Sequence, residues 1–167
     1  MRVLAFDISL NLPGVAVVEV PESSKLKGKP KVVAVGHVKT SAKDNYAART
    51  KHIESYMHLF IREHGPYDAI VREAYAGKMP NINYAIFSGW NACDRALNDF
   101  GLAVTEKALG QAEVKKLVVG KGRAEKEEVA EAVREWTGYE EAFATSDESD
   151  AIAIGLAYLI REGVIKR

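Results

Sequence analysis

The chain has 167 residues, of which 47% are hydrophobic, so it is long enough to bury the core of one domain. Lysine plus arginine and aspartate plus glutamate number 23 each, which excludes a strong overall positive field that would attract a polyanion. No charged and then apolar leader opens the sequence, and no run of about 18 apolar residues occurs, so we expect a soluble, cytoplasmic protein without a membrane partner. We expect residues 1–167 to form a single domain.

The first part of the sequence predicts an antiparallel meander of three strands. Residues 2–8 are almost all apolar, which is typical of a strand covered on both faces, and Asp7 interrupts one of these faces. A turn leads to a second strand at residues 15–20, and a lysine-bearing loop at 21–30 leads to a third strand at 32–38. Because an unpaired acid is rare in a strand buried on both faces, Asp7 needs a partner.

Helical and strand patterns alternate in the middle of the chain. Apolar residues at spacings of three, four and seven predict a helix from Tyr46 to the turn at Gly65. Residues 68–73 form a short apolar run, which indicates a buried parallel strand reached by a crossover helix. Glu73 closes this strand in the same way that Asp7 closes the first.

A second long helix is expected to begin at Pro80 and to end before Gly101. Its apolar stripe includes Cys93, the only cysteine, which we interpret as a small buried hydrophobe in a reducing compartment. Residues 102–105 are expected to form a fifth strand, and residues 111–117 a short helix or turn.

Two helices complete the predicted fold. Residues 124–136 form a charged helix, and the last helix runs from near Thr145 to Gly163, with Thr145 and Glu148 matching a capping box. The predicted fold class is therefore α/β: a five-stranded mixed sheet, with three antiparallel strands followed by parallel strands, flanked by helices.

Four carboxylates stand where these strands end and the last helix begins: Asp7, Glu73, Asp147 and Asp150. Asp147 and Asp150 are three residues apart, so they share one face of a helix and can approach one ion together. Acids at such positions are costly unless a cation binds them, and two divalent metals gathered by such a cluster can drive phosphoryl hydrolysis. A structural role stays open for Asp147, because acids in a first helical turn also favour the helix dipole.

Basic residues gather in two patches, each of which is typical either of a solvated surface or of a phosphate-binding one. The patches comprise Lys25, Lys27, Lys29 and Lys31, and then Lys115, Lys116, Lys121, Arg123 and Lys126. Zinc or NTPase chemistry has little support, because the four histidines lack the i, i+4 spacing of a zinc helix and Gly120–Gly122 lacks the rest of a P-loop.

Four sequence segments together carry a resemblance to a known family. They are AFDIS followed by a G-V-A-V strand, AIVREAY, VVGKGRAEKEEV and SDESDAIAIGLA, of which the last two are the most specific. With these segments in this order, nearly the whole chain resembles the RuvC family of Holliday junction resolvases, which have an RNase H-like fold.

The resemblance implies a catalytic site with two Mg²⁺ ions, for which Mn²⁺ is expected to substitute. Asp7 would bridge both ions, Glu73 would hold one, and Asp147 with Asp150 would hold the other. Lys126 would lie near the scissile phosphate. The implied reaction is hydrolysis of a DNA phosphodiester, with symmetric nicks in a four-way junction and 5′-phosphate products.

The resemblance also implies partners for the chain. Its DNA-binding residues are expected to be Lys115, Lys116, Lys121, Arg123, Lys126, Tyr75 and Lys78. A homodimer is expected through the helix Pro80 to Asn98, with Phe87 and Trp90 as candidates for that surface. A core role for Trp90 is equally open.

The sequence departs from the family pattern at three places. Family members commonly carry a small pair after the first Asp, where this chain has Ile8 and Ser9, and the loop at 21–30 is long. Some members place a base-wedging aromatic three residues after the Glu, a position that is Ala76 here, with Tyr75 one residue early. Strand opening and cleavage preference therefore stay undecided, as do two other functions: an RNase H-like nuclease for other branched DNA or RNA, and a non-catalytic module that binds branched DNA.

Overall fold

A five-stranded sheet with the order β3-β2-β1-β4-β5 forms the centre of the computed structural model, which describes residues 1–21, 29–75 and 80–166. β1 is antiparallel to β2, and β2 to β3, whereas β1 and β4, and β4 and β5, are parallel. The strands are β1 (Arg2–Asp7), β2 (Gly14–Glu19), β3 (Lys31–His37), β4 (Ala69–Ala74) and β5 (Leu109–Gly110). The predicted mixed sheet is thus confirmed.

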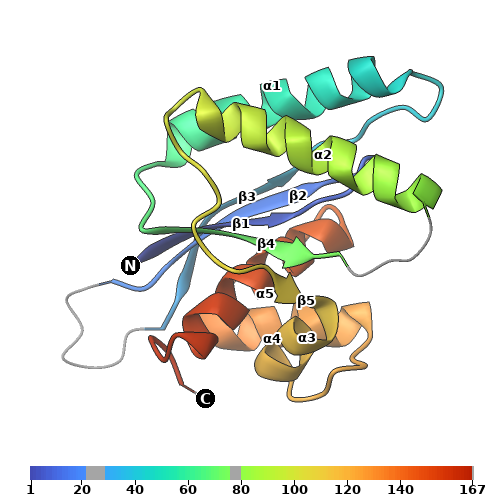
Figure 1. The fold of residues 1–167 in the computed structure, drawn as a ribbon. Coiled ribbons are helices and arrows are strands. Elements are labelled where there is room, and N and C mark those ends of the chain that lie inside the picture. The colour runs from blue at the N-terminus through green and yellow to red at the C-terminus, as the bar shows by residue number, and fades with distance from the viewer. Residues whose placement is uncertain (22–28, 76–79, 167) are drawn as a thin grey trace.

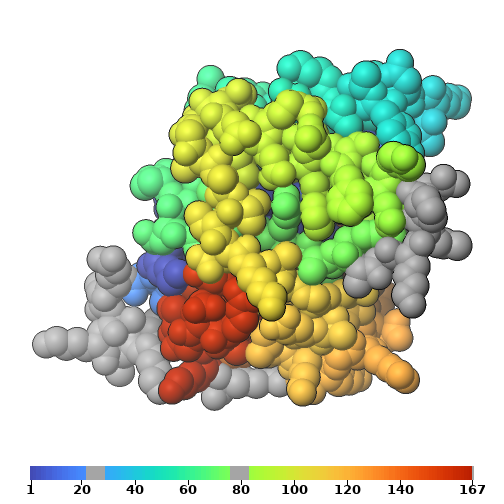
Figure 2. Space-filling model, in the orientation of Figure 1, coloured from blue at the N-terminus to red at the C-terminus, as the bar shows by residue number. Residues whose placement is uncertain are grey.

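Within the described residues, five helices cover the two faces of this sheet. They are α1 (Tyr46–His64), α2 (Pro80–Asn98), α3 (Gln111–Val118), α4 (Lys126–Thr137) and α5 (Ser146–Arg161). Figure 1 shows α1 and α2 together on one side of the sheet and α3, α4 and α5 on the other. In the space-filling view the same two helical layers make up the upper and lower parts of the molecule (Figure 2).

The alternation of side chains along β1 divides the core between these two layers. Val3 and Ala5 belong to the cluster packed with α5, whereas Leu4 and Phe6 belong to the cluster packed with α1 and α2, as the period of a strand requires. Cys93 of α2 is buried in the second cluster, as expected. No helix in the described part of the chain combines the length and the apolar character needed to cross a membrane.

The prediction of a fifth strand at residues 102–105 is wrong. Thr105 touches β4 at one point only: its backbone N–H donates to the Ile70 carbonyl at 3.0 Å, and its hydroxyl accepts from the Ile70 N–H at 2.9 Å. Because a side chain takes the place of a backbone acceptor, no ladder develops there. The chain joins the sheet later, where Leu109 pairs with Glu73.

The last helix begins where the sequence predicted, but its N-terminal cap differs from the prediction. Thr145 occupies the N-cap position, but its buried hydroxyl has no hydrogen-bond partner among the described residues, so the predicted capping box is wrong. Glu148 turns away from Thr145, accepts a hydrogen bond from the Ala144 N–H at 2.7 Å, and lies 2.8 Å from His37 Nδ1 on β3. The first turn of α5 is therefore held from outside the helix.

Candidate active site

Three of the four predicted carboxylates line one pocket at the carboxyl ends of β1 and β4. Asp7 is the last residue of β1, and Glu73 lies one register step beyond the Phe6–Arg72 pair of the parallel β4. Asp150 reaches the pocket from α5. The pocket is lined by Asp7, Glu73, Gln111, Val114, Lys115, Val129, Asp150 and Ile154.

Asp7 lies in surroundings that oppose its ionisation. Burial raises the pKa of the Asp7 carboxyl well above its usual range, and the charges of Glu73, Asp150 and Asp147 raise it further. The ammonium of Lys126 acts in the opposite direction but is the weakest of these influences. A cation in the pocket would remove this penalty.

Glu73 and Asp150 share the same environment. The pKa of Glu73 is raised to about 7, mainly by burial and also by the charge of Asp150, while Lys115 acts in the opposite direction. Burial also raises the pKa of Asp150, and there Lys126 and Lys115 lower it while Asp147 raises it. Lys115 therefore offsets part of the acid repulsion on both side chains, and Lys126 does so on Asp150.

Asp147 lies next to this pocket and is not among the residues that line it. Its charge raises the pKa of both Asp7 and Asp150, so it belongs to the same electrostatic cluster. Its backbone comes close to β2: a Cβ at Gly14 would lie 2.2 Å from the Asp147 carbonyl oxygen, so only glycine fits there.

The acidic set fits a hard divalent cation by its chemistry, because carboxylate oxygens are the preferred ligands of Mg²⁺ and Mn²⁺. Across residues 1–21, 29–75 and 80–166, no three His, Cys, Asp or Glu side chains are arranged to hold one ion together. Binding therefore requires the carboxylates of Asp7, Glu73 and Asp150 to turn toward a common point, and neutralisation of their mutual repulsion favours that movement.

The basic residues of the second patch divide into two groups. Lys126 Nζ donates to Ser146 Oγ at 2.8 Å, beside the start of α5, and Lys115 Nζ donates to the Ala124 carbonyl at 2.7 Å from the pocket wall. Of the five basic residues, Lys115 lines the pocket, whereas four are exposed and outside its lining: Lys116, Lys121, Arg123 and Lys126. Lys121 is paired with Glu128 on α4.

Of the remaining predicted site residues, only Tyr75 is among the described residues. Tyr75 follows β4 directly and is half-buried. Lys78 and Ala76 lie outside the described residues, as does most of the loop at 21–30. The predictions for Lys78 and for the wedge position therefore stay predictions.

Sequence reasoning missed two contacts that connect the site to the rest of the fold. Arg72, next to Glu73, faces the opposite side of β4, pairs with Asp94 at 3.0 Å, and places its guanidinium carbon 4.1 Å from the centroid of the Trp90 ring. The contact between His37 and Glu148 is the second. Residues so far apart in the chain give no local signal of either contact.

Comparisons with known proteins agree with this geometry. The family model described as crossover junction endodeoxyribonuclease RuvC matches residues 3–158. The RuvC of Rickettsia bellii is 31% identical over 160 residues, which cover 96% of this chain and 98% of that protein. The RuvC of Erythrobacter litoralis is 32% identical over 155 residues, which cover 93% of this chain and 90% of that protein.

Solved structures show the same RNase H-like fold. The structure of Thermus thermophilus RuvC has a TM-score of 0.79 with 28% identity over 99% of both chains. Its complex with a Holliday junction substrate has a TM-score of 0.81 with 28% identity over 99% of this chain and 98% of that one. The fowlpox virus Holliday junction resolvase, 14% identical with a TM-score of 0.53, shares the fold alone. With the family model spanning most of its length, this chain belongs to the RuvC family of crossover junction endodeoxyribonucleases.

Proposed function

We propose that this protein is a structure-specific DNA endonuclease that resolves four-way junctions, with residues 1–167 acting as one nuclease domain. The observation that carries the proposal is the pocket in which Asp7, Glu73 and Asp150 meet at the carboxyl ends of two parallel strands. Membership of the RuvC family supports the substrate, because the similar Thermus thermophilus protein is described in complex with a Holliday junction. The free, buried thiol of Cys93 is consistent with the cytoplasm.

Two Mg²⁺ ions, or Mn²⁺ in their place, are the proposed cofactors, with Asp7, Glu73, Asp147 and Asp150 as ligands. Such ions activate a water for attack on a phosphodiester and neutralise the leaving oxygen. The four carboxylates supply the negative charge that holds them. Lys126 is proposed to bind the phosphate beside these acids, which its hydrogen bond to Ser146 at the start of α5 supports.

The exposed basic residues next to the pocket are proposed to hold the DNA backbone. Lys116 and Arg123 are exposed and free to reach phosphates, whereas Lys121 must exchange its Glu128 partner for one. Lys115 has its ammonium on the Ala124 carbonyl and near Glu73, so it acts at the edge of the pocket. Tyr75, which directly follows β4, is proposed to extend this DNA-binding surface, and Lys78 is proposed as a further DNA-binding residue from the sequence alone.

A homodimer through α2 is the proposed assembly. Tyr84 and Phe87 of α2 are 69% and 51% exposed, and Tyr46 of α1 is 46% exposed beside them, which is much apolar surface for neighbouring helices. Trp90 is half-buried, with its ring centroid 5.4 Å from that of Phe87. Trp90 thus joins the core to the proposed dimer surface. Sedimentation equilibrium of the wild type and of Phe87→Glu tests this part.

Cleavage of defined substrates tests the proposed activity. A labelled four-way junction incubated with the protein and Mg²⁺ should give paired nicks at symmetric positions, with 5′-phosphate ends. Linear duplex, single-arm branches and RNA of the same sequence should be cut far more slowly. Preferred cleavage of RNA or of other branched DNA would assign a different nuclease activity, and junction binding without any cleavage would leave a binding module.

A further inference from the structure

A row of residues crosses three strands beneath the first turn of α5. Asp7 at the end of β1 pairs in register with Gly14 of β2, and Gly14 pairs with His37 of β3. Each position has its own relation to α5: Asp7 feels the charge of Asp147, Gly14 leaves room for the Asp147 backbone, and His37 bonds a side chain of the helix. These three residues therefore form the surface on which the first turn of α5 lies, here called the seat of α5.

Glu148 is the side chain that joins α5 to this seat, although it is a charged residue only 7% exposed. Its Oε1 accepts from His37 Nδ1 at 2.8 Å, and its Oε2 accepts from the Ala144 N–H at 2.7 Å. Both oxygens are thus engaged away from the pocket. Glu148 is also rotated by about 100° from Asp147 around the helix, so it does not share the ligand face.

The first turn of α5 depends on this contact because the usual cap is missing. Thr145 stands at the N-cap position, and its buried hydroxyl makes no hydrogen bond within the described residues. An N-cap side chain ordinarily fixes the first turn by accepting from its backbone N–H groups. Here the contacts of Glu148 with the edge strand and with Ala144 supply that restraint, together with the hydrogen bond from Lys126 to Ser146.

We propose that Glu148 and His37 are positioning residues that hold the first turn of α5 over the sheet, so that Asp147 stays beside Asp7. The identity of the bound ion rests on the proposed function, but the positioning itself does not. The contact spans β3 and α5, two elements far apart in the chain. Loosening it lets the turn that carries Asp147 move away from Gly14, which weakens the binding of a cation.

Two substitutions at residue 148 separate this role from a simple need for charge. Glu148→Gln removes the charge but keeps both contacts, since its amide oxygen accepts from the Ala144 N–H and its amide N–H donates to the other tautomer of His37. Glu148→Ala removes both contacts. The measurement is the Mg²⁺ concentration that gives half of the maximal rise in melting temperature, with the same titration repeated for junction cleavage.

We expect Glu148→Ala to raise the half-saturating Mg²⁺ concentration about 10-fold, the usual effect of changing a residue that orients a metal ligand. Glu148→Gln should match the wild type, and the cleavage rate at saturating Mg²⁺ should be nearly kept in both. His37→Ala, which leaves the Ala144 contact in place, should give a smaller shift that His37→Asn reverses. If Glu148→Ala does not fold, the comparison of His37→Ala with His37→Asn tests the proposal in its place.

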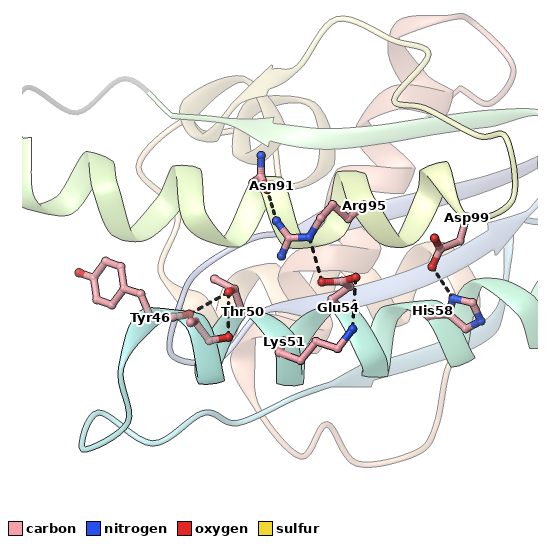
Figure 3. Close-up of polar contacts among 9 residues, drawn as sticks. Tyr46, Thr50, Lys51, Glu54, His58, Asn91, Arg95 and Asp99 are labelled. Carbon is pink, nitrogen blue, oxygen red and sulfur yellow. Dashed lines mark hydrogen bonds and ion pairs between the residues drawn. The ribbon is translucent and has the colours of Figure 1, made fainter.

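A matched control lies on the other face of the sheet. His58 and Asp99 form a more exposed histidine–carboxylate pair, also at 2.8 Å, between α1 and the end of α2, shown in Figure 3. Asp99→Ala removes a histidine–carboxylate contact without touching α5, so its Mg²⁺ titration should follow the wild type. A shift as large as that of Glu148→Ala would show that the effect is general destabilisation.

Three results would overturn the proposal: an unchanged Mg²⁺ titration in Glu148→Ala, an equal loss in Glu148→Gln and Glu148→Ala, or no Mg²⁺ stabilisation of the wild type. The second result would make Glu148 a ligand or a required charge. If the wild type cleaves no junction while the titrations follow the expected order, the positioning role stands and the proposed substrate is wrong.

Discussion

The two faces of the sheet use charged residues in opposite ways. On the α1–α2 face, Arg49 is buried and hydrogen-bonded to the loop after β1, and Arg72 is held by Asp94. On the α3–α5 face, the pKa values of Asp7 and Glu73 are raised, because burial and neighbouring acids disfavour their charged forms. Charges on the first face are satisfied within the fold. On the second face, Asp7 and Glu73 reduce the stability of the metal-free protein, which is the expected cost of a binding site.

The largest expected effect is the loss of activity in Asp7→Asn. Cleavage of a labelled four-way junction should fall by more than about 100-fold, since even a residue that only orients a metal ligand costs 10- to 100-fold when changed. The melting temperature in EDTA should rise, because a neutral amide replaces a buried carboxylate repelled by Glu73 and Asp150. Mg²⁺ should then add little stability.

The matched change on the other face is Asp94→Asn, which weakens the partner of Arg72. It should lower the melting temperature and leave the rise caused by Mg²⁺ intact. If Asp7→Asn also melted lower than the wild type in EDTA, Asp7 would be a satisfied structural residue and the contrast between the faces would fail.

Arg49→Met tests how much a buried, hydrogen-bonded charge on the α1–α2 face contributes to stability. The guanidinium of Arg49 donates to Thr40 Oγ1 at 3.0 Å and to the Leu10 carbonyl at 3.3 Å, and it also bonds the Asn11 side chain. Hydrogen bonds to charged groups contribute roughly 1.5–3 kcal/mol each, with incomplete additivity, so unfolding in urea should show a loss of about 3 kcal/mol.

Arg95 is the matched control for Arg49, because its pair with Glu54 on α1 is 2.9 Å long but 44% of the Arg95 side chain is exposed (Figure 3). Arg95→Met should therefore cost only about 0–1 kcal/mol. Equal losses in the two variants would mean that burial does not determine what these charges contribute.

The acid pocket also predicts how stability depends on pH in the absence of metal. The pKa of Glu73 is raised from 4.5 to about 7, so the folded state binds a proton more tightly than the unfolded state does. This contribution is fully present below about pH 4.5 and is lost as the pH rises through 7. Melting temperatures in EDTA should fall between pH 5 and pH 8, to an extent that Glu73→Gln reduces. A curve that rises over this interval would contradict the assigned direction.

The sequence predicted those parts of the fold whose signal is local. Helical periodicity located α1 and α2, and alternation along β1 assigned its two faces correctly. The strand at 102–105 failed because an apolar run does not specify its partner, and the hydroxyl of Thr105 replaced a backbone acceptor. Acids that interrupt or end apolar segments marked Asp7, Glu73 and Asp150, and the sequence neighbours of Asp7 and Asp150 are buried.

The parts of the site that could not be predicted depend on contacts between distant elements. Glu148 matched a capping box with Thr145 in the sequence. In the fold its carboxylate instead bonds His37 of β3, and the Thr145 hydroxyl has no partner among the described residues. The basic patch could not be divided from sequence into pocket and surface residues. Only the fold shows that Lys115 belongs to the first group and Lys121 to the second.

The smallest expected effect concerns Lys115, whose positive charge offsets the repulsion among the acids on the α3–α5 face. It lowers the pKa of Glu73 and Asp150 and donates to the Ala124 carbonyl. If its ammonium also neutralises a phosphate, Lys115→Met should weaken junction binding in Ca²⁺ and reduce the slope of log affinity against log salt by about one. Lys121→Met, from an exposed residue, serves as the comparison. An unchanged slope, together with a higher pH at which metal-free stability is lost, would show that Lys115 serves the carboxylates alone and leaves the DNA to the exposed lysines.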